Sequence, residues 1–392
     1  MTNQKIPIWS GVFFLLLFVG ILFASWALSG NGHSAKAVFE NAKSSLGKGD
    51  WNQAVAGFTR TIELSPKFSI AYDDRAMAER ELKEYDQAIS DCDRAIEVNP
   101  SDYFAFVERG LSEAGKGDSQ GAIADLLHAA RFNPTNSYAF YELGVVDCQL
   151  SNFSEAVECL NHAIQLGDNS SAVYIYRGTA KFNEADLAGA ILDYSKATEL
   201  NPNDSAGYYG RGLAKAKEFD FSAAISDYDR VIALDQTNST AYQDRGLANL
   251  DQFKLKAAIA DFGMAIELNP TNSMCYNDRG WAEFETGDFD SSIADATRSI
   301  QLDPDLGNAY GTRGWARYRK GEISGAVEDC KKALQLSEHG SAEISCDQGL
   351  LDFIAGDYKK AMVDWQNAMK LEPDLRKELL PWIEKAQTKL RQ

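Results

Sequence analysis

The chain has 392 residues and a formal net charge of −18, from 57 acidic and 39 basic side chains. An acidic molecule repels phosphate backbones, so a nucleic acid is not an expected partner. The six cysteines form no C-x-x-C pair and share no spacing with the four histidines, so no metal site and no cofactor is predicted. The cysteine pairs to test for a disulfide are Cys330 with Cys346 and Cys148 with Cys159.

Residues 8–28 form an apolar stretch of 21 residues in which only Ser10 and Ser25 are polar. At roughly 1.5 Å per residue, a helix of this length reaches about 30 Å and crosses a bilayer core. Trp9 and Trp26 lie near its ends, where indole rings favour the membrane interface. The stretch predicts a single-pass anchor after a tail of residues 1–7. A cleaved signal peptide, with export of the remainder, is the alternative. The flanking lysines do not decide which side of the membrane holds the rest of the chain.

After a linker of residues 29–34, residues 35–375 repeat with a period of 34 residues. Each repeat carries two stretches of apolar residues at helical spacing, parted by a turn such as Gly117-Asp118, and most repeats end in proline. One such hairpin cannot bury its apolar face alone, so ten hairpins are expected to stack into a solenoid. The repeats begin at Ala35, Ser69, Tyr103, Ser137, Ser171, Ser205, Ser239, Ser273, Gly307 and, after one inserted residue, Ala342.

The eighth place of each repeat is glycine or alanine, the twentieth is alanine except for Ser292, and the fourth is often aromatic. With the terminal prolines, this pattern resembles the tetratricopeptide repeat (TPR) family. The resemblance implies an all-α fold, a right-handed superhelix of helical hairpins whose first helices line a concave surface that binds a protein or peptide. Asp168, Gln236 and Glu338 depart from the pattern, since proline is expected there.

Residues 376–392 follow the last repeat and predict a capping helix. Their apolar stripe has a charged back, which suits the exposed end of a solenoid. The stripe consists of Leu379, Ile383, Ala386 and Leu390.

Seven repeats have arginine at the seventh place, where the family usually has leucine, and each has aspartate sixteen residues later. Antiparallel helices would bring the two side by side, so the pattern predicts a structural guanidinium–carboxylate pair inside each hairpin. The alternative is that the arginines bind an acidic partner. The pairs are Arg75 with Asp91, Arg109 with Asp125, Arg177 with Asp193, Arg211 with Asp227, Arg245 with Asp261, Arg279 with Asp295, and Arg313 with Asp329.

Places two, five, nine and twelve share one face of the first helix and carry aromatic side chains, which dominate interface energetics. The alternative is that these rings pack between successive helices. The sixth place is acidic in seven repeats: Glu40, Asp74, Glu108, Glu142, Asp244, Asp278 and Asp347. A basic or aromatic-rich peptide is therefore the expected partner. The predicted groove residues are Tyr138, Tyr141, Phe182, Asp244, Asp278, Trp281, Phe284, Glu285, Trp315, Tyr318, Leu350 and Phe353.

The chain shows no GK[ST] loop, HExxH or GxSxG motif, and its histidines are scattered, so an enzyme is not predicted. The expected function is a membrane-tethered scaffold that binds a protein or peptide in its concave groove. Two alternatives stay open: a self-associating organiser of a membrane complex, and an exported TPR protein after signal cleavage.

Overall fold

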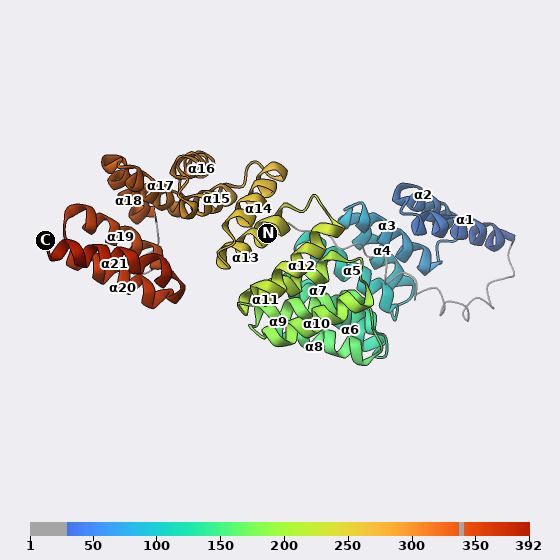
Figure 1. Cartoon of the computed structure of the whole chain (residues 1–392). Coiled ribbons are helices and arrows are strands. Elements are labelled where there is room, and N and C mark those ends of the chain that lie inside the picture. The colour runs from blue at the N-terminus through green and yellow to red at the C-terminus, as the bar shows by residue number, and fades with distance from the viewer. Residues whose placement is uncertain (1–29, 337–340) are drawn as a thin grey trace. The chain divides into compact units, whose positions relative to one another are not determined.

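The structure is a computed structural model that describes residues 30–336 and 341–392, without the side chains of residues 30–33 and 374. The predicted anchor, residues 8–28, lies outside the described residues. The chain divides into an N-terminal body, Met1–Ala214, and a C-terminal body, Lys215–Gln392, with the boundary inside one helix (Figure 1). Their relative placement is not determined.

Every element in the described residues is a helix, and the helices alternate as the first and second members of hairpins. The first helices are α1 (Gly30–Gly47), α3 (Ser69–Glu81), α5 (Tyr103–Lys116), α7 (Ser137–Gln149), α9 (Ser171–Asn183), α11 (Ser205–Lys217), α13 (Ser239–Asp251), α15 (Ser273–Thr286), α17 (Gly307–Lys320) and α19 (Ala342–Ala355). The second helices are α2 (Trp51–Leu64), α4 (Tyr85–Val98), α6 (Ser119–Phe132), α8 (Phe153–Gln165), α10 (Leu187–Leu200), α12 (Phe221–Leu234), α14 (Leu255–Leu268), α16 (Phe289–Leu302), α18 (Ile323–Leu336) and α20 (Tyr358–Leu371). A 3₁₀ turn (Pro373–Leu375) and α21 (Arg376–Leu390) end the chain.

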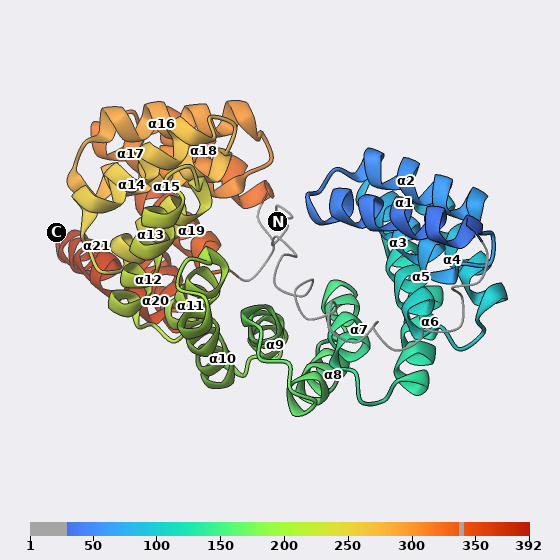
Figure 2. The same ribbon diagram turned by 90° about the vertical axis from the view of Figure 1, so that its right-hand side faces the viewer.

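Within each body, every hairpin stacks on the next. The second helix of one repeat contacts the first helix of the following repeat, as in α4 with α5, and successive first helices also touch, as in α3 with α5. In the N-terminal body, α5, α7 and α9 lie along the inner side of the curve and α6, α8 and α10 along the outer side (Figure 2). The first helices therefore line the concave side of this body. We call the face that the first helices form in each body the first-helix surface.

Small residues set the spacing inside each hairpin. A Cβ on Gly246 in α13 would lie 2.8 Å from the Phe262 ring, which is fully buried in α14. The alanines at the twentieth place, such as Ala258, are fully buried at the same crossing. The two helices of a hairpin therefore pack this closely only where one of them has glycine or alanine at the crossing.

The turns between paired helices need a left-handed residue. Gly117 and Gly287 supply it with φ of 92° and 87°, whereas Lys83, Ala185 and Phe253 adopt φ of 65°, 65° and 57° despite their Cβ atoms. A side-chain-bearing residue in this region is strained by roughly 1–2 kcal/mol. The packing of the helices on either side of each turn offsets this strain.

Candidate functional site

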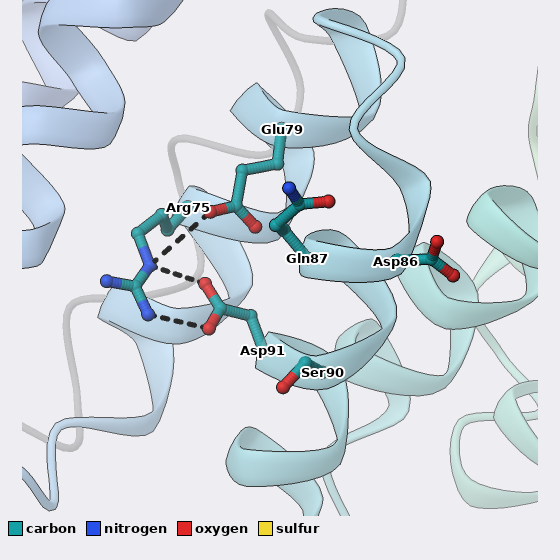
Figure 3. A pocket seen from close by; sticks show the side chains of 6 residues that line it. All are labelled: Arg75, Glu79, Asp86, Gln87, Ser90 and Asp91. Carbon is teal, nitrogen blue, oxygen red and sulfur yellow. Dashed lines mark hydrogen bonds and ion pairs between the residues drawn. The ribbon is translucent and has the colours of Figure 1, made fainter.

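A guanidinium–carboxylate pair joins the two helices in six of the repeats. In Figure 3, Arg75 Nε donates to Asp91 Oδ2 at 2.5 Å and Arg75 Nη2 donates to Asp91 Oδ1 at 2.6 Å, which links α3 to α4. The same paired contact joins Arg109 to Asp125, Arg177 to Asp193, Arg245 to Asp261, Arg279 to Asp295, and Arg313 to Asp329. Arg211 and Asp227 belong to different bodies. The paired carboxylates are almost fully buried, so the pairs hold the hairpins from within.

The third guanidinium nitrogen reaches the preceding repeat, a contact that the sequence reasoning missed. Arg109 Nη1 donates to Asp93 Oδ1 at 2.6 Å, and Arg177 Nη1 donates to Asn161 Oδ1 at 2.7 Å. For six of the seven arginines the acceptor stands sixteen residues before the arginine, at the twenty-fifth place of the preceding repeat, whereas Gly263 holds this place before Arg279. The signal was present in the sequence, because this place is polar before most of the arginines. The other acceptors are Thr59, Ser195, Asp229 and Thr297.

The arginines have little left to offer a ligand. Each guanidinium carbon lies 5.3–5.8 Å from the centre of the aromatic ring three residues earlier, as in Arg245 over Tyr242. The exposed fraction of the six paired arginine side chains runs from 14% in Arg313 to 24% in Arg279. Donors that are already paired and half covered favour a structural role over binding of an acidic partner.

A second acid accompanies the paired aspartate in some repeats. Glu79 lies beside Arg75 and Asp91 at the opening shown in Figure 3, and its Oε2 is buried without a hydrogen-bond partner. Burial and the Asp91 charge raise the pKa of Glu79 to about 8. The pKa values of Glu113 and Glu283 are raised to about 7 by burial and by the corresponding aspartates. These three carboxyls therefore hold their protons to higher pH than ordinary glutamates do.

Carboxylates gather on the first-helix surface of the N-terminal body. Asp73 and Asp74 come from α3 and Glu108 from α5, and Asp73 and Glu108 are only 2% and 0% exposed. Three oxygens here, Asp73 Oδ1, Asp74 Oδ2 and Glu108 Oε1, are buried and accept no hydrogen bond. We call Asp73, Asp74, Glu108 and Glu142 the acidic cluster. The ion pair at its edge is that of Arg80 Nε with Glu108 Oε2, at 2.9 Å.

Asp73, Asp74 and Glu142 of the acidic cluster have raised pKa values, so they hold their protons to higher pH than ordinary carboxyls do. Burial, with Glu108 and Glu40 adding to it and Lys43 opposing it, raises the pKa of Asp74 to about 7. Burial also raises the pKa of Glu142 to about 7, against the pull of Arg80. The pKa of Asp73 is raised well above its usual value by burial and then by Asp102, Asp74 and Glu108. A positive charge placed beside these three carboxyls would stabilise their charged forms and lower their pKa values.

The acids of the C-terminal body have internal partners instead. Asp347 accepts a hydrogen bond from Trp315 Nε1 at 3.0 Å. Asp278 accepts from Asn277 and Gln243, and burial raises its pKa to about 6. Burial raises the pKa of Glu285, and the charge of Arg319 acts in the opposite direction. Asp244 is half-buried. The two bodies therefore differ in how their sixth-place acids are satisfied.

Most of the predicted aromatic groove lies inside the C-terminal body. Phe284, Trp315 and Phe353 are 5%, 5% and 6% exposed, and Leu350 is fully buried. They share one apolar cluster with Trp365 of α20 and with Leu379, Ile383 and Ala386 of α21. Trp281, stacked on Phe284 with centroids 5.2 Å apart, and Tyr318 are half-buried at its edge. As the structure stands, these side chains are packed against the chain itself.

The remaining groove residues lie in the N-terminal body and are half-buried. Tyr138 in α7 stacks on Phe104 with centroids 6.5 Å apart. Tyr141, also in α7, meets Tyr176 edge-on at 6.0 Å. Phe182 packs at the edge of the cluster around Tyr194. Tyr138 and Tyr141 bridge neighbouring repeats, and all three rings leave part of their surface to solvent.

The described residues show neither a metal site nor a disulfide. Among the residues that the structure describes, no group of three or more His, Cys, Asp or Glu side chains is placed to hold a metal ion. All six cysteines are free, so neither candidate disulfide is formed. In residues 30–336 and 341–392, no helix is long and apolar enough to cross a membrane.

The tetratricopeptide repeat family model matches residues 39–103, 74–139 and 277–341. The comparison with curated proteins gave no match. Among solved structures, MamA is 30% identical over 41% of this chain and 93% of its own, with a TM-score of 0.39. A TPR protein from Parabacteroides merdae is 20% identical, over 66% of this chain and all 100% of its own, with a TM-score of 0.49. YrrB, described as a TPR protein with an unusual peptide-binding site, is 25% identical over 47% of this chain and 95% of its own, with a TM-score of 0.40.

The chain contains tetratricopeptide repeats, as the matched residues and the stacked 34-residue hairpins show. The prediction of an all-α fold built from TPR hairpins is confirmed. Proteins of this class generally mediate protein–protein interactions.

Proposed function

We propose that the chain is a non-enzymatic scaffold that binds a basic segment of a partner protein on the first-helix surface of its N-terminal body. The observation that supports this most is the acidic cluster, in which three buried carboxylate oxygens from α3 and α5 accept no hydrogen bond. A buried polar group without a partner costs roughly 1–3 kcal/mol, and a charged one costs more. Asp74 is half-buried, so it is the member of this group that a guanidinium or ammonium group from a partner would reach.

The charge of the whole molecule supports the same choice of partner. At −18 the chain attracts cationic segments over long range and repels acidic ones. The half-buried Tyr138 of α7 lies close enough to Glu142 and Glu108 of the acidic cluster for their charges, after burial, to raise its pKa. It offers a ring beside which an arginine of the partner can stack.

Binding of labelled peptides to the full chain tests this function. The probes are two fluorescein-labelled octapeptides, one alternating arginine with alanine and one alternating glutamate with alanine. Anisotropy at pH 8 should show binding of the arginine peptide alone, weakened several-fold when salt rises from about 50 to about 300 mM. The double variant that carries both Asp74→Asn and Glu142→Gln should bind the arginine peptide roughly tenfold more weakly, as expected for the loss of charge-assisted contacts.

The matched control removes the same number of charges from the second helices. Glu63 and Glu97 are exposed to 57% and 62% and pair only with arginines on their own helices. Glu63→Gln with Glu97→Gln should change the dissociation constant by less than about twofold, because exposed charges are screened. Equal weakening by both double variants, or no binding of the arginine peptide, would contradict the proposal.

We further propose that residues 8–28 tether this scaffold to a membrane, because a stretch of 21 residues in which only Ser10 and Ser25 are polar suffices for a span. Sequencing the mature N-terminus tests the tether. Retention of residues 8–28 supports it, and a mature chain that begins near residue 28 or 30 argues for an exported protein.

A further inference from the structure

Helix α21 packs on the end of the C-terminal body through one face and turns another face towards the first helices. Leu379, Ile383 and Ala386 are 3%, 5% and 0% exposed and join the cluster of α19 and α20, whereas Leu390 is 42% exposed. This face does what a capping helix requires. The neighbouring face carries Trp382 and Lys385, which a cap does not need.

Trp382 lies among four rings of three different helices. Its ring centroid is 5.1 Å from Trp315 and 5.6 Å from Tyr318 in α17, 6.0 Å from Phe353 in α19 and 6.1 Å from Trp365 in α20. Trp315, Tyr318 and Phe353 are the rings that the sequence predicts as a partner-binding strip. The chain therefore places its own tryptophan where a partner's aromatic anchor would bind.

Two lysines of α21 extend the same contact. Lys385 Nζ lies 5.6 Å from the ring centre of Tyr318 and 5.5 Å from that of Phe353. Near the start of α21, Lys377 Nζ lies 4.6 Å from the ring centre of Phe253, in the turn between α13 and α14. Helix α21 therefore crosses the first-helix surface from repeat 7 to repeat 10, beyond the reach of a cap on repeat 10 alone.

Other contacts of α21 oppose its binding. Glu378 lies close enough to Glu285 of α15 and to Glu372 for these charges, after burial, to raise its pKa to about 7. Lys385 has a pKa lowered by burial and then by Arg319 of α17 and Lys389 of α21. Pro381 stands inside the helix and removes one backbone hydrogen bond. Like charges and a missing hydrogen bond make α21 easier to release than a helix selected only for stability.

We propose that the first-helix surface of repeats 8–10 is a docking site for an amphipathic helix that presents a tryptophan and, one turn later, a cation. In this structure α21 occupies this site with Trp382 and Lys385. A partner helix of the same pattern would displace it. This inference rests on the proposed scaffold function and names a second partner class for it.

A labelled peptide of residues 376–392, added to the full chain, tests the site. The open variant carries Trp382→Ala and Ile383→Ala, which weaken the chain's own helix. It should bind the peptide at least about tenfold tighter than the wild type, because the tethered helix no longer competes at high effective concentration. The matched control, Leu380→Ala with Leu390→Ala, changes side chains of α21 that are 40% and 42% exposed and should behave like the wild type.

The peptide itself provides the second control. A peptide with Trp382→Ala should not bind the open variant. If the open variant melts cooperatively yet binds the intact peptide no better than the wild type does, the site is overturned. A wild-type dimer that dissociates when peptide is added would assign the site to a second copy of the chain and overturn the partner helix.

A measurement on the unmodified chain covers the case in which the open variant does not fold. Excess unlabelled peptide should speed hydrogen exchange of the chain's own residues 376–390 and leave α4 unchanged. Unchanged exchange in α21 would overturn the inference. Neither experiment involves the arginine octapeptide, so the acidic cluster and the α21 site can each fail without the other.

Discussion

Arg245 Nη1 lies 2.6 Å from Asp229 Oδ1, and Arg245 Nη2 lies 2.5 Å from Asp261 Oδ1. One guanidinium on a first helix thereby joins the second helices of two successive repeats. Because the Asp261 side chain is 7% exposed and that of Asp229 is 56% exposed, the bond within the repeat is the buried one. Loss of the arginine loosens both the hairpin and its stacking.

The buried pair predicts a non-additive mutant cycle. Asp261→Asn should destabilise the chain by roughly 3–5 kcal/mol, because it leaves the Arg245 charge without its main partner. Arg245→Leu with Asp261→Leu should cost less than either single leucine substitution. Urea unfolding of the three leucine variants and of Asp261→Asn gives the comparison, and additive losses would contradict the pairing.

Two glycines only seventeen residues apart should respond to alanine with opposite signs. Gly246→Ala places a methyl group 2.8 Å from the buried Phe262 ring and should cost about 1–3 kcal/mol. Gly263 lies within α14, where an added Cβ meets only Arg279 Nη1 at 3.7 Å. Gly263→Ala should therefore gain up to about 1 kcal/mol from helix propensity. Thermal melts of both variants check the signs, and a loss at both positions would show that the hairpin crossing is not the cause.

The strained turns predict a stabilising substitution. Ala185 adopts φ of 65° between α9 and α10, where some of the other repeats have glycine. Ala185→Gly should raise stability by about 1 kcal/mol, since glycine enters the left-handed region without strain. Gly117→Ala, at φ of 92°, is the reciprocal control and should lower the melting temperature. An unchanged melting temperature in both variants would contradict the strain.

The shared acids predict that stability falls as pH rises. The folded-state pKa values of about 8 for Glu79 and about 7 for Glu113 and Glu283 exceed the ordinary glutamate value of 4.5. Between about pH 4.5 and 8 the folded chain therefore holds more protons than the unfolded chain, which favours unfolding as protons are withdrawn. Replacing all three by glutamine should flatten this part of the profile of melting temperature against pH.

The control for the pH profile uses exposed glutamates. Glu63→Gln, Glu97→Gln and Glu199→Gln change side chains that are 57%, 62% and 68% exposed. This triple variant should keep the wild-type slope. If both triple variants show the wild-type slope, the shared acids do not set it.

The repeat itself was predictable from the sequence because it depends on local patterns that recur ten times. The 34-residue period gave the helical hairpins, and the small eighth and twentieth places gave the close crossing between paired helices. The interaction of Arg109 with Asp93 was missed although both residues lie in the same periodic frame. Its acceptor type varies among aspartate, asparagine, serine and threonine, which hides the pattern from a search for one residue type.

The contacts of α21 could not be predicted in the same way. The period ends at residue 375, so nothing in the repeat frame indicates what Trp382 touches. The repeat pattern of the first helices predicts that Trp315 and Phe353 belong to an exposed partner-binding strip. The structure instead covers that strip with α21, which lies outside the period. The acidic cluster was visible as charge, but the burial that leaves Glu108 Oε1 without a partner depends on packing between repeats.

Hydrogen exchange of the full chain with and without the arginine octapeptide tests the central claim most directly. Binding at the acidic cluster predicts slower exchange in α3, α5 and α7, and unchanged exchange in α4, α6 and α8. Protection confined to the second helices, or no protection at saturating peptide, would contradict a scaffold that holds basic partners on its first-helix surface.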